Sequence, residues 1–242
     1  MPTPDFRFKQ FTIRHDRSAM KVGTDGVLLG AWASGRLSTE ECPREHITIL
    51  DVGTGTGLIA LMLAQRFPHA DIVGIDIDEA SIEQAKENVE TSPFRQRIRI
   101  QRQDFNAIDS CFNKYEIIVS NPPFYKEETL GTELARNAAR HTTSLPFEKL
   151  VENASRLLSE KGLFSVIIPY GEASSFISLC ALNKLYLQRR LDVRSSERKP
   201  FKRALLEFCK AIRPVETATL TLQDADNNRT TDYTALTQAF YL

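Results

Sequence analysis

The stretch that decides the fold is Ile47–Gly57, ITILDVGTGTG. Its first half is a continuous run of apolar and β-branched residues, which is typical of a strand buried on both faces of a parallel sheet. Its second half is rich in glycine and leads into the apolar residues 58–64, LIALMLA, which predict a helix. A strand, a tight loop and a helix in this order predict a ligand site at the carboxyl end of the strand, because the loop brings bare backbone to the mouth of the helix.

The spacing of the glycines separates two kinds of cofactor. The dinucleotide pattern G-x-G-x-x-G would need a third glycine at position 58, where the chain has Leu58. The loop instead reads D-x-G-x-G-x-G, with Asp51, Gly53, Gly55 and Gly57 as its members. A carboxylate at the end of the strand suits the cationic amino group of S-adenosylmethionine and offers little to a pyrophosphate. A plain strand-to-helix turn is the alternative.

A second strand decides between these alternatives. Residues 71–76, DIVGID, are again mostly apolar and end in Asp76, which lies 19 residues after Gly57. At that separation a carboxylate at the end of the neighbouring strand reaches the two ribose hydroxyls of a bound nucleoside. The sequence therefore predicts an S-adenosylmethionine site at the first two strands.

Length and composition limit the other possibilities. The 242 residues are 42% hydrophobic, which suffices for one large α/β core with an appendage. Thirty-one basic residues balance 31 acidic ones, so any surface for nucleic acid must be local. The four cysteines are far apart, form no C-x-x-C and do not cluster with the histidines, which predicts reduced thiols, no metal and a cytoplasmic protein. No signal-like start and no run of about 18 apolar residues is present, so no membrane partner is expected.

Two further segments are candidates for the walls of the cofactor site. Before the first strand, Lys21, Thr24 and Gly26 lie in MKVGTDG, residues 20–26, where two glycines predict a turn that exposes backbone; an ordinary cap on the sheet is the alternative. A third predicted strand, residues 98–101, runs towards Asp104 and Phe105. An acid and an apolar ring there suit the amine and the face of an adenine, although a helix cap explains the acid equally well.

The chemical signal follows a fourth predicted strand, residues 115–120, as Asn121-Pro122-Pro123-Phe124. Two consecutive prolines remove two N–H groups and stiffen the backbone. The carbonyls of Asn121 and Pro122 therefore cannot be used as hydrogen-bond acceptors by a helix that starts there. The side-chain oxygen of Asn121 adds an acceptor, and Phe124 offers a flat apolar face. Together they describe a socket for a planar NH2 group, with Asn121, Pro122 and Phe124 as catalytic residues. The competing explanation is a rigid loop, and the nearby glycine loop favours the socket.

In this order on successive strands, these segments resemble the class I S-adenosylmethionine-dependent methyltransferases that modify amino nitrogens. Residues 8–11, 20–32, 139–143 and 233–241 add a narrower resemblance to the bacterial tRNA adenine-N6 methyltransferases that act on adenosine 37 of a valine tRNA. The resemblance runs over essentially the whole chain. Tyr is common in the family at the position of Phe124; the ring is retained here and a hydroxyl is lost, so the chemistry should survive.

The expected fold is α/β: a doubly wound, mostly parallel, Rossmann-like sheet of seven strands with an antiparallel carboxyl-terminal edge. Residues 1–35 are expected to form an amino-terminal hairpin and a cofactor-covering element, and residues 36–242 the methyltransferase domain. A loop from residue 125 to 143 is a candidate cover for the substrate. The sequence does not determine the oligomeric state, for which a monomer is the expectation.

Basic residues gather outside the predicted sheet core. Between residues 186 and 213 nine Lys or Arg stand against three acids, and the loop 194–203 also carries an aromatic residue. A charge run is usually a solvated face, but this composition fits phosphate contacts with one stacking group. Residues 7–21, with five basic residues against one acid, form a second candidate patch. The residues expected to contact tRNA are Arg140, Arg198, Lys199, Lys202 and Arg203.

The expected reaction is transfer of a methyl group from S-adenosylmethionine to N6 of an adenosine in tRNA. The same tetrapeptide also serves guanine-N2 methylation in ribosomal RNA and glutamine methylation in release factors, and the local sequence leaves both open. Outside enzymes, the alternative is a cofactor-dependent RNA-binding module. The intact acceptor motif argues against such a module.

Overall fold

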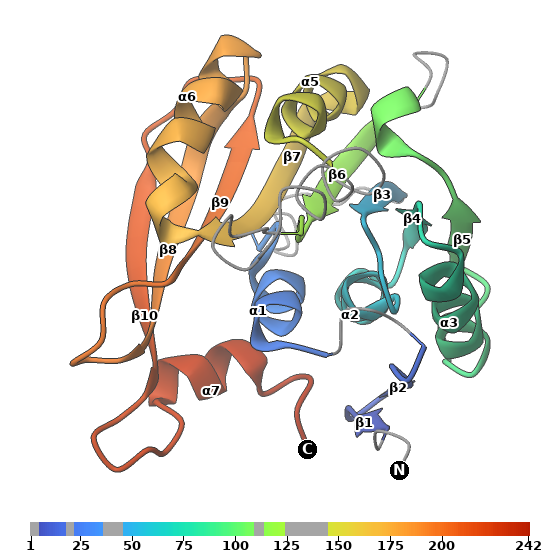
Figure 1. The fold of residues 1–242 in the computed structure, drawn as a ribbon, viewed down its shortest axis with the longest axis horizontal. Helices are drawn as coiled ribbons and strands as arrows, with labels where there is room; N and C mark the ends of the chain where they lie inside the picture. Colours follow the sequence, from blue (N-terminus) through green and yellow to red (C-terminus); the bar gives the residue numbers. More distant parts are fainter. Residues whose placement is uncertain (1–4, 18–21, 36–45, 109–113, 124–144) are drawn as a thin grey trace, which may run out of the picture.

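The computed structural model describes residues 5–17, 22–35, 46–108, 114–123 and 145–242. An eight-stranded sheet crosses the molecule in the order β10-β8-β9-β7-β6-β3-β4-β5 (Figure 1). Its strands are β3 (Ile47–Val52), β4 (Ala70–Asp76), β5 (Ile98–Arg102), β6 (Tyr115–Ser120), β7 (Leu158–Pro169), β8 (Tyr186–Ser196), β9 (Arg203–Cys209) and β10 (Glu216–Gln223).

The predicted Rossmann-like, mostly parallel sheet is confirmed, but the expectation of seven strands with an antiparallel edge is wrong in detail. The antiparallel strand is β9, which lies inside the sheet between β7 and β8. The edge is β10, an eighth strand that runs parallel to β8. Most of β10 is exposed and only Leu220 is buried, so it lacks the continuous apolar run that marks the central strands.

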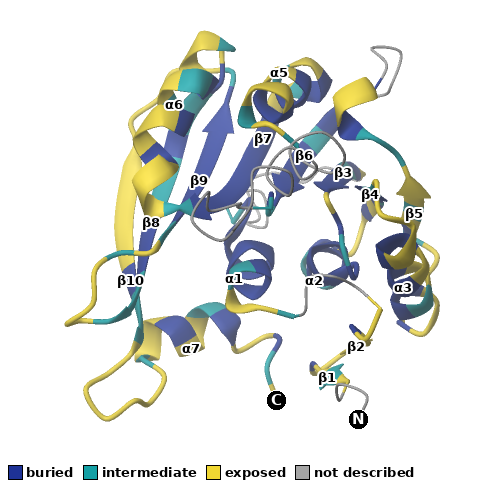
Figure 2. Ribbon diagram, viewed as in Figure 1, coloured by how far each residue is buried: buried dark blue, intermediate teal, exposed yellow. Residues whose placement is uncertain are grey.

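Helices cover both faces of this sheet. One face carries α1 (Thr24–Trp32), α2 (Leu58–Arg66), α3 (Glu79–Glu90) and α7 (Thr231–Thr237), and the other carries α5 (Phe147–Leu157) and α6 (Ala173–Leu182). Each face of the sheet forms a hydrophobic core with its helices: the first core lies on the side of α1 and α2, and the second on the side of α5 and α6. Successive residues of β3 point to opposite faces, so Ile49 packs in the first core and Leu50 in the second, and both are fully buried. Figure 2 shows the same contrast between dark central strands and the exposed outer sides of α6 and β10.

The predicted amino-terminal hairpin is present as β1 (Phe6–Arg7) and β2 (Thr12–Ile13), which pair antiparallel. Phe8 and Phe11 stack with ring centroids 4.7 Å apart and are buried. The carboxyl end of the chain completes this hairpin, since the Lys9 N–H donates to the carbonyl of Phe240 at 2.8 Å and Phe8 stacks on Tyr241 at 6.0 Å. The hairpin and the carboxyl-terminal residues therefore share one aromatic cluster, and Figure 1 shows β1, β2 and the carboxyl end on the same side of the molecule.

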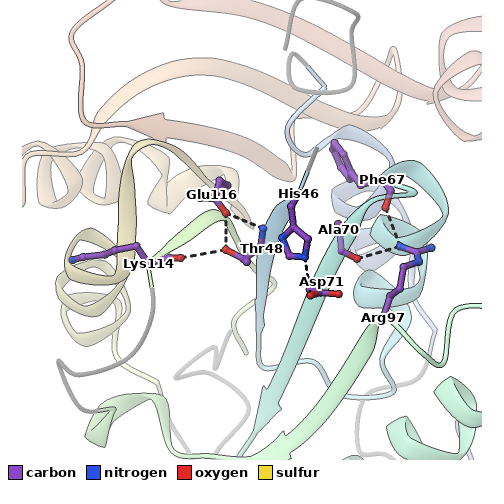
Figure 3. Close-up of polar contacts among 8 residues, drawn as sticks. All are labelled: His46, Thr48, Phe67, Ala70, Asp71, Arg97, Lys114 and Glu116. Atoms are coloured by element: carbon purple, nitrogen blue, oxygen red, sulfur yellow. Dashed lines mark hydrogen bonds and ion pairs between the residues drawn. The ribbon is translucent and has the colours of Figure 1, made fainter. Parts of the chain in front are cut away.

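Polar side chains fasten the amino ends of the central strands (Figure 3). Thr48 donates both its N–H, at 2.8 Å, and its hydroxyl, at 2.6 Å, to the carboxylate of Glu116. Arg97 donates to the carbonyls of Phe67, at 3.0 Å, and Ala70, at 3.2 Å, which follow α2. These polar groups form hydrogen bonds with one another at the amino ends of the strands. The predicted ligand site lies at the opposite, carboxyl ends.

Candidate active site

The glycine loop between β3 and α2 has a left-handed backbone at every second residue. The φ angles of Gly53, Gly55 and Gly57 are +71°, +55° and +81°, a region in which any L side chain is strained. A Cβ at Gly53 or Gly55 would meet nothing within 4 Å, so these two residues present bare backbone to open space. A Cβ at Gly57 would lie 3.5 Å from the Cβ of Ala85. The first two glycines thus shape an open cradle, and the third is the left-handed N-cap of α2.

Asp51 holds this loop from below and is fully buried. Its Oδ2 accepts a hydrogen bond from the Thr54 hydroxyl at 2.7 Å and another from the Ala60 N–H at 3.1 Å. Burial raises the pKa of Asp51 from 3.8 to about 7; the two hydrogen bonds oppose the rise, and the charge of Asp76 adds to it. Its Oδ1 is buried without a partner among the described residues. The expected contact with a cationic amino group remains a prediction for that second oxygen.

Asp76 ends β4, next to the glycine loop, and is partly exposed. Its Oδ2 accepts from the Gly55 N–H at 2.9 Å, and its Oδ1 accepts from the Asp78 N–H at 3.0 Å. A carboxylate offers about four lone-pair sites, so two remain for the hydroxyl groups of a ribose. Asp76 therefore shapes the loop and keeps the capacity that its predicted role requires.

The segment before the first strand is only in part the exposed turn that its glycines predict, since Gly23 and Thr24 are exposed and Gly26 is buried. Thr24 and Gly26 lie in the first turn of α1, behind an N-cap at Gly23. Gly26 is buried, and a Cβ there would lie 3.0 Å from the side chain of Leu58 at the start of α2. In the described structure this glycine brings two helices together, and Lys21 lies outside the described residues.

Asp104 and Phe105 have internal contacts. Asp104 caps the short 3₁₀ helix η1 (Phe105–Ala107) by accepting from the Asn106 N–H at 2.8 Å, as the helix-cap alternative predicted. The ring of Phe105 is buried in the second core, and its carbonyl accepts from Nδ2 of Asn153 at 2.7 Å. Contact of either residue with an adenine remains a prediction.

The sheet brings Asn121 next to the glycine loop. Val52 and Ser120 are paired residues at the ends of β3 and β6, and the Ser120 hydroxyl donates to the carbonyl of Val52 at 3.0 Å. Gly53 and Asn121 are the next residues on each strand. The acceptor motif and the cofactor loop therefore share one edge of the sheet.

Asn121 carries an unused acceptor at this edge. Its Oδ1 is buried and has no hydrogen-bond partner among the described residues, while Pro122 behind it is buried. An unpaired buried acceptor costs about 1 to 3 kcal/mol, so such an atom is typical of a place where a ligand supplies the donor. Phe124 and the expected cover 125–143 lie outside the described residues.

Asn88 supports the loop and was not predicted from the sequence. It lies on α3, is buried, and its Nδ2 donates to the carbonyls of Thr56 and Arg14, both at 2.9 Å. It thereby joins the glycine loop to the segment after the hairpin. The available signal was a pair of amides four residues apart, Gln84 and Asn88, on the buried face of a helix.

The expected RNA-contact residues lie at the same carboxyl edge, in and after the loop that joins β8 to β9. Arg198, Lys199 and Lys202 are exposed. Arg203 begins β9, and its Nε lies 2.7 Å from the carboxylate of Asp25 in α1. Three of these side chains therefore face solvent, while the fourth ties the loop to α1. Arg140 lies outside the described residues.

Within the described ranges, no helix is long and apolar enough to cross a bilayer, and no cluster of three or more His, Cys, Asp or Glu is arranged as a metal site. Cys180 and Cys209 are buried and form no disulfide. The other two cysteines, Cys42 and Cys111, lie outside the described residues.

Residues 36–175 match the family model of the methyltransferase small domain. The tRNA1(Val) (adenine(37)-N6)-methyltransferase of Trichodesmium erythraeum is 44% identical over 98% of this chain and 97% of its own length, and that of Bacteroides thetaiotaomicron is 42% identical over 100% and 99%. Among solved structures, a predicted O-methyltransferase of Agrobacterium tumefaciens superposes with a TM-score of 0.68 at 16% identity, covering 89% of this chain and 96% of that one, which supports the fold. The chain belongs to the family of tRNA1(Val) (adenine(37)-N6)-methyltransferases.

Proposed function

We propose that this protein transfers a methyl group from S-adenosylmethionine to N6 of adenosine 37 in a valine tRNA. The observation that carries the proposal is the unpartnered Oδ1 of Asn121 beside a glycine loop that is open at Gly53 and Gly55. An amino group is the donor that such an acceptor lacks. The full-length relatives with this activity in their names support the same assignment.

The residues present fit the cofactor. The open backbone at Gly53 and Gly55 admits a ligand, Asp76 retains acceptors for the ribose, and the free oxygen of Asp51 suits an amino group. S-adenosylmethionine supplies an electrophilic methyl group on a sulfonium sulfur. The amino-terminal hairpin borders this site in our proposal, which is supported by Asn88 of α3: this side chain joins Arg14, just after the hairpin, to Thr56 of the glycine loop.

The chemistry of the socket follows from the nature of the target nitrogen. N6 of adenosine is a poor nucleophile because its lone pair is delocalised into the ring. Acceptors from Asn121 and the Pro122 carbonyl hold its two hydrogens, favour the pyramidal nitrogen and stabilise the positive charge that develops on it. Phe124 stacks on the base. No general base is needed, because the methylated ammonium loses its proton to water.

RNA binding uses the exposed basic loop after β8. Arg198, Lys199 and Lys202 contact phosphates, and Arg140 adds a further contact. The target base must leave its stack to enter the socket, which costs less in a single-stranded anticodon loop than in a duplex. One chain carries both the socket and the basic loop, so the protein acts as a monomer, in the cytoplasm where tRNA is modified.

The test is methyl transfer to defined substrates. The protein is incubated with labelled cofactor and an unmodified valine tRNA, and the digested nucleosides are analysed by mass spectrometry. We expect N6-methyladenosine at position 37 and none in a control tRNA that carries guanosine there. Methylation of guanine-N2 in ribosomal RNA or of glutamine in a release factor would replace the proposal. Binding of RNA and cofactor without transfer would indicate a binding module.

A further inference from the structure

Tyr170 is an exposed aromatic side chain at the same edge of the sheet as Asn121, and the reaction as described does not use it. It follows β7, in the short 3₁₀ helix η3 (Tyr170–Glu172), and 38% of its surface is exposed. Its ring lies 5.4 Å from that of Phe201, with an angle of 31° between the planes. Phe201 belongs to the basic loop, so the pair joins the end of β7 to that loop.

Arginines flank both rings. The guanidinium carbon of Arg190 lies 5.4 Å from the centre of Tyr170, and that of Arg194 lies 5.5 Å from the centre of Phe201. Arg190 is also paired with Asp192 at 2.8 Å. Arg194 bonds the Thr221 hydroxyl and the Glu197 carbonyl and has no carboxylate partner among the described residues, so its positive charge is not neutralised there.

Backbone hydrogen bonds hold this arrangement in place. The Tyr170 N–H donates to the Lys202 carbonyl at 3.1 Å, and the Lys202 N–H donates to the Val193 carbonyl at 2.8 Å. The rings are thus positioned by β7 and β8, and their geometry does not depend on a ligand. Preorganised aromatic faces beside cationic side chains are typical of surfaces that stack single-stranded bases.

Strand register fixes the distance from the socket. Ser120 of β6 pairs with Val166 of β7. Asn121 lies one residue beyond this pair and Tyr170 four residues beyond it, so standard strand spacings place their Cα atoms within about 11 Å of each other. Nearby nucleotides of one extended RNA strand can span that distance.

We propose that Tyr170 and Phe201 form a stacking platform for the base of a nucleotide close to the target adenosine in the single-stranded anticodon loop. The inference rests on the proposed function for its substrate. Arg194 supplies charge for the adjacent phosphate. The platform holds the strand on one side of the base that has been turned into the socket, and so offsets part of the cost of unstacking it.

The test measures the affinity for the anticodon stem-loop of a valine tRNA that carries 2-aminopurine beside the target adenosine. Tyr170→Leu should raise the Kd by about 5- to 150-fold, because a base loses its stacking partner. Tyr170→Phe keeps the ring and should stay within about twofold of the parent. The salt dependence should not change in either variant, since no charge is removed. Tyr186→Leu, at the opposite end of β8, is the matched control and should bind like the parent.

Three results would overturn the platform. They are an unchanged Kd in Tyr170→Leu, an equal loss in Tyr170→Phe, and an equal loss in the Tyr186→Leu control. The proposed function is tested separately by the parent chain: normal methylation with an unchanged Kd in Tyr170→Leu removes only the platform. If the parent transfers no methyl group but Tyr170→Leu still binds the RNA more weakly than the parent, the platform is supported and the proposed function is not.

Discussion

At the scale of single residues, Asn121 separates catalysis from binding. Asn121→Ala deletes one acceptor and leaves both prolines and the glycine loop in place. Because charge grows on the nitrogen only as the methyl group moves, the loss should fall on the transfer rate rather than on the affinity for either ligand. We expect a decrease of about 100- to 1,000-fold, or about 2.7 to 4 kcal/mol, by analogy with the loss of one oxyanion-hole donor.

Single-turnover methylation of an unmodified valine tRNA with saturating cofactor measures this rate. Asn106→Ala is the control, because Asn106 is an exposed asparagine in η1 at the same edge of the sheet and should give the parent rate. Transfer at the parent rate by Asn121→Ala would show that the socket lies elsewhere.

Asp51 makes stability depend on pH. Burial raises its pKa to about 7, so the folded protein keeps a proton that the unfolded chain releases near pH 3.8. The stabilisation from this group is complete below the lower value and is lost as the pH rises through about 7. Between these two pH values, the free energy of unfolding of the ligand-free parent should fall by on the order of 4 kcal/mol more than that of Asp51→Asn. The reason is that the asparagine side chain does not titrate.

Urea unfolding at a series of pH values checks this expectation. Asp226→Asn replaces an exposed acid and should follow the parent at each pH. Parallel curves for the parent and Asp51→Asn would mean that Asp51 titrates in the folded protein as it does in the unfolded chain.

At the scale of elements, the loop between β8 and β9 is the testable unit for RNA affinity. Neutralising Arg198, Lys199 and Lys202 together should weaken tRNA binding for all sequences alike. The salt dependence, log K against log salt, should become shallower by up to about three units of slope if all three contact phosphates. Arg203 is left in place because it pairs with Asp25, and its removal would disturb α1.

The control removes the same number of positive charges at the opposite edge of the sheet, by neutralising Lys161, Lys184 and Arg213, which are all exposed. This control should keep the slope of the parent. If the loop variant and the parent have identical slopes, the loop faces only solvent. Cofactor affinity, measured by calorimetry, should be unchanged in both variants.

Elements also show what the sequence could predict. β6 has its predicted bounds, Tyr115–Ser120, because burial on both faces leaves a continuous apolar run that is readable locally. The start of α1 was predicted as a turn, because Gly26 has the local signature of a turn while its actual constraint is a close approach to Leu58, far along the chain. Asp104 shows the same limit, since a capping acid and a ligand-binding acid look alike in sequence.

For the molecule as a whole, the family and the sheet could be predicted from the sequence, but the contacts between the amino-terminal hairpin and the carboxyl-terminal segment could not. Two of the segments that carry the narrower resemblance, 8–11 and 233–241, pack on each other in the structure. Their periodicity showed that they were apolar but could not show that they were partners, because packing between distant segments has no local pattern. Asn88 was missed for the same reason.

The joined ends predict an energetic coupling between Phe8 and Tyr241. Each ring truncated to alanine should destabilise the protein, and the double variant should lose less than the sum of the two by about 0.5 to 1.5 kcal/mol, the coupling of an aromatic pair. Urea unfolding of the four proteins of the cycle measures it. Phe8 and Phe164, which lie in different cores, form the control cycle and should be additive. Additivity in the Phe8 and Tyr241 cycle would mean that the stacked rings contribute nothing beyond their separate burial.

The bond from the Lys9 N–H to the Phe240 carbonyl also sets an order of events during synthesis. A ribosome makes residues 6–13 well before residues 233–241, and the whole eight-stranded sheet lies between them in the sequence. The hairpin must therefore wait for its aromatic partners while every strand of that sheet is made. Among the contacts of the described residues, this aromatic cluster is one of the last that a growing chain can form.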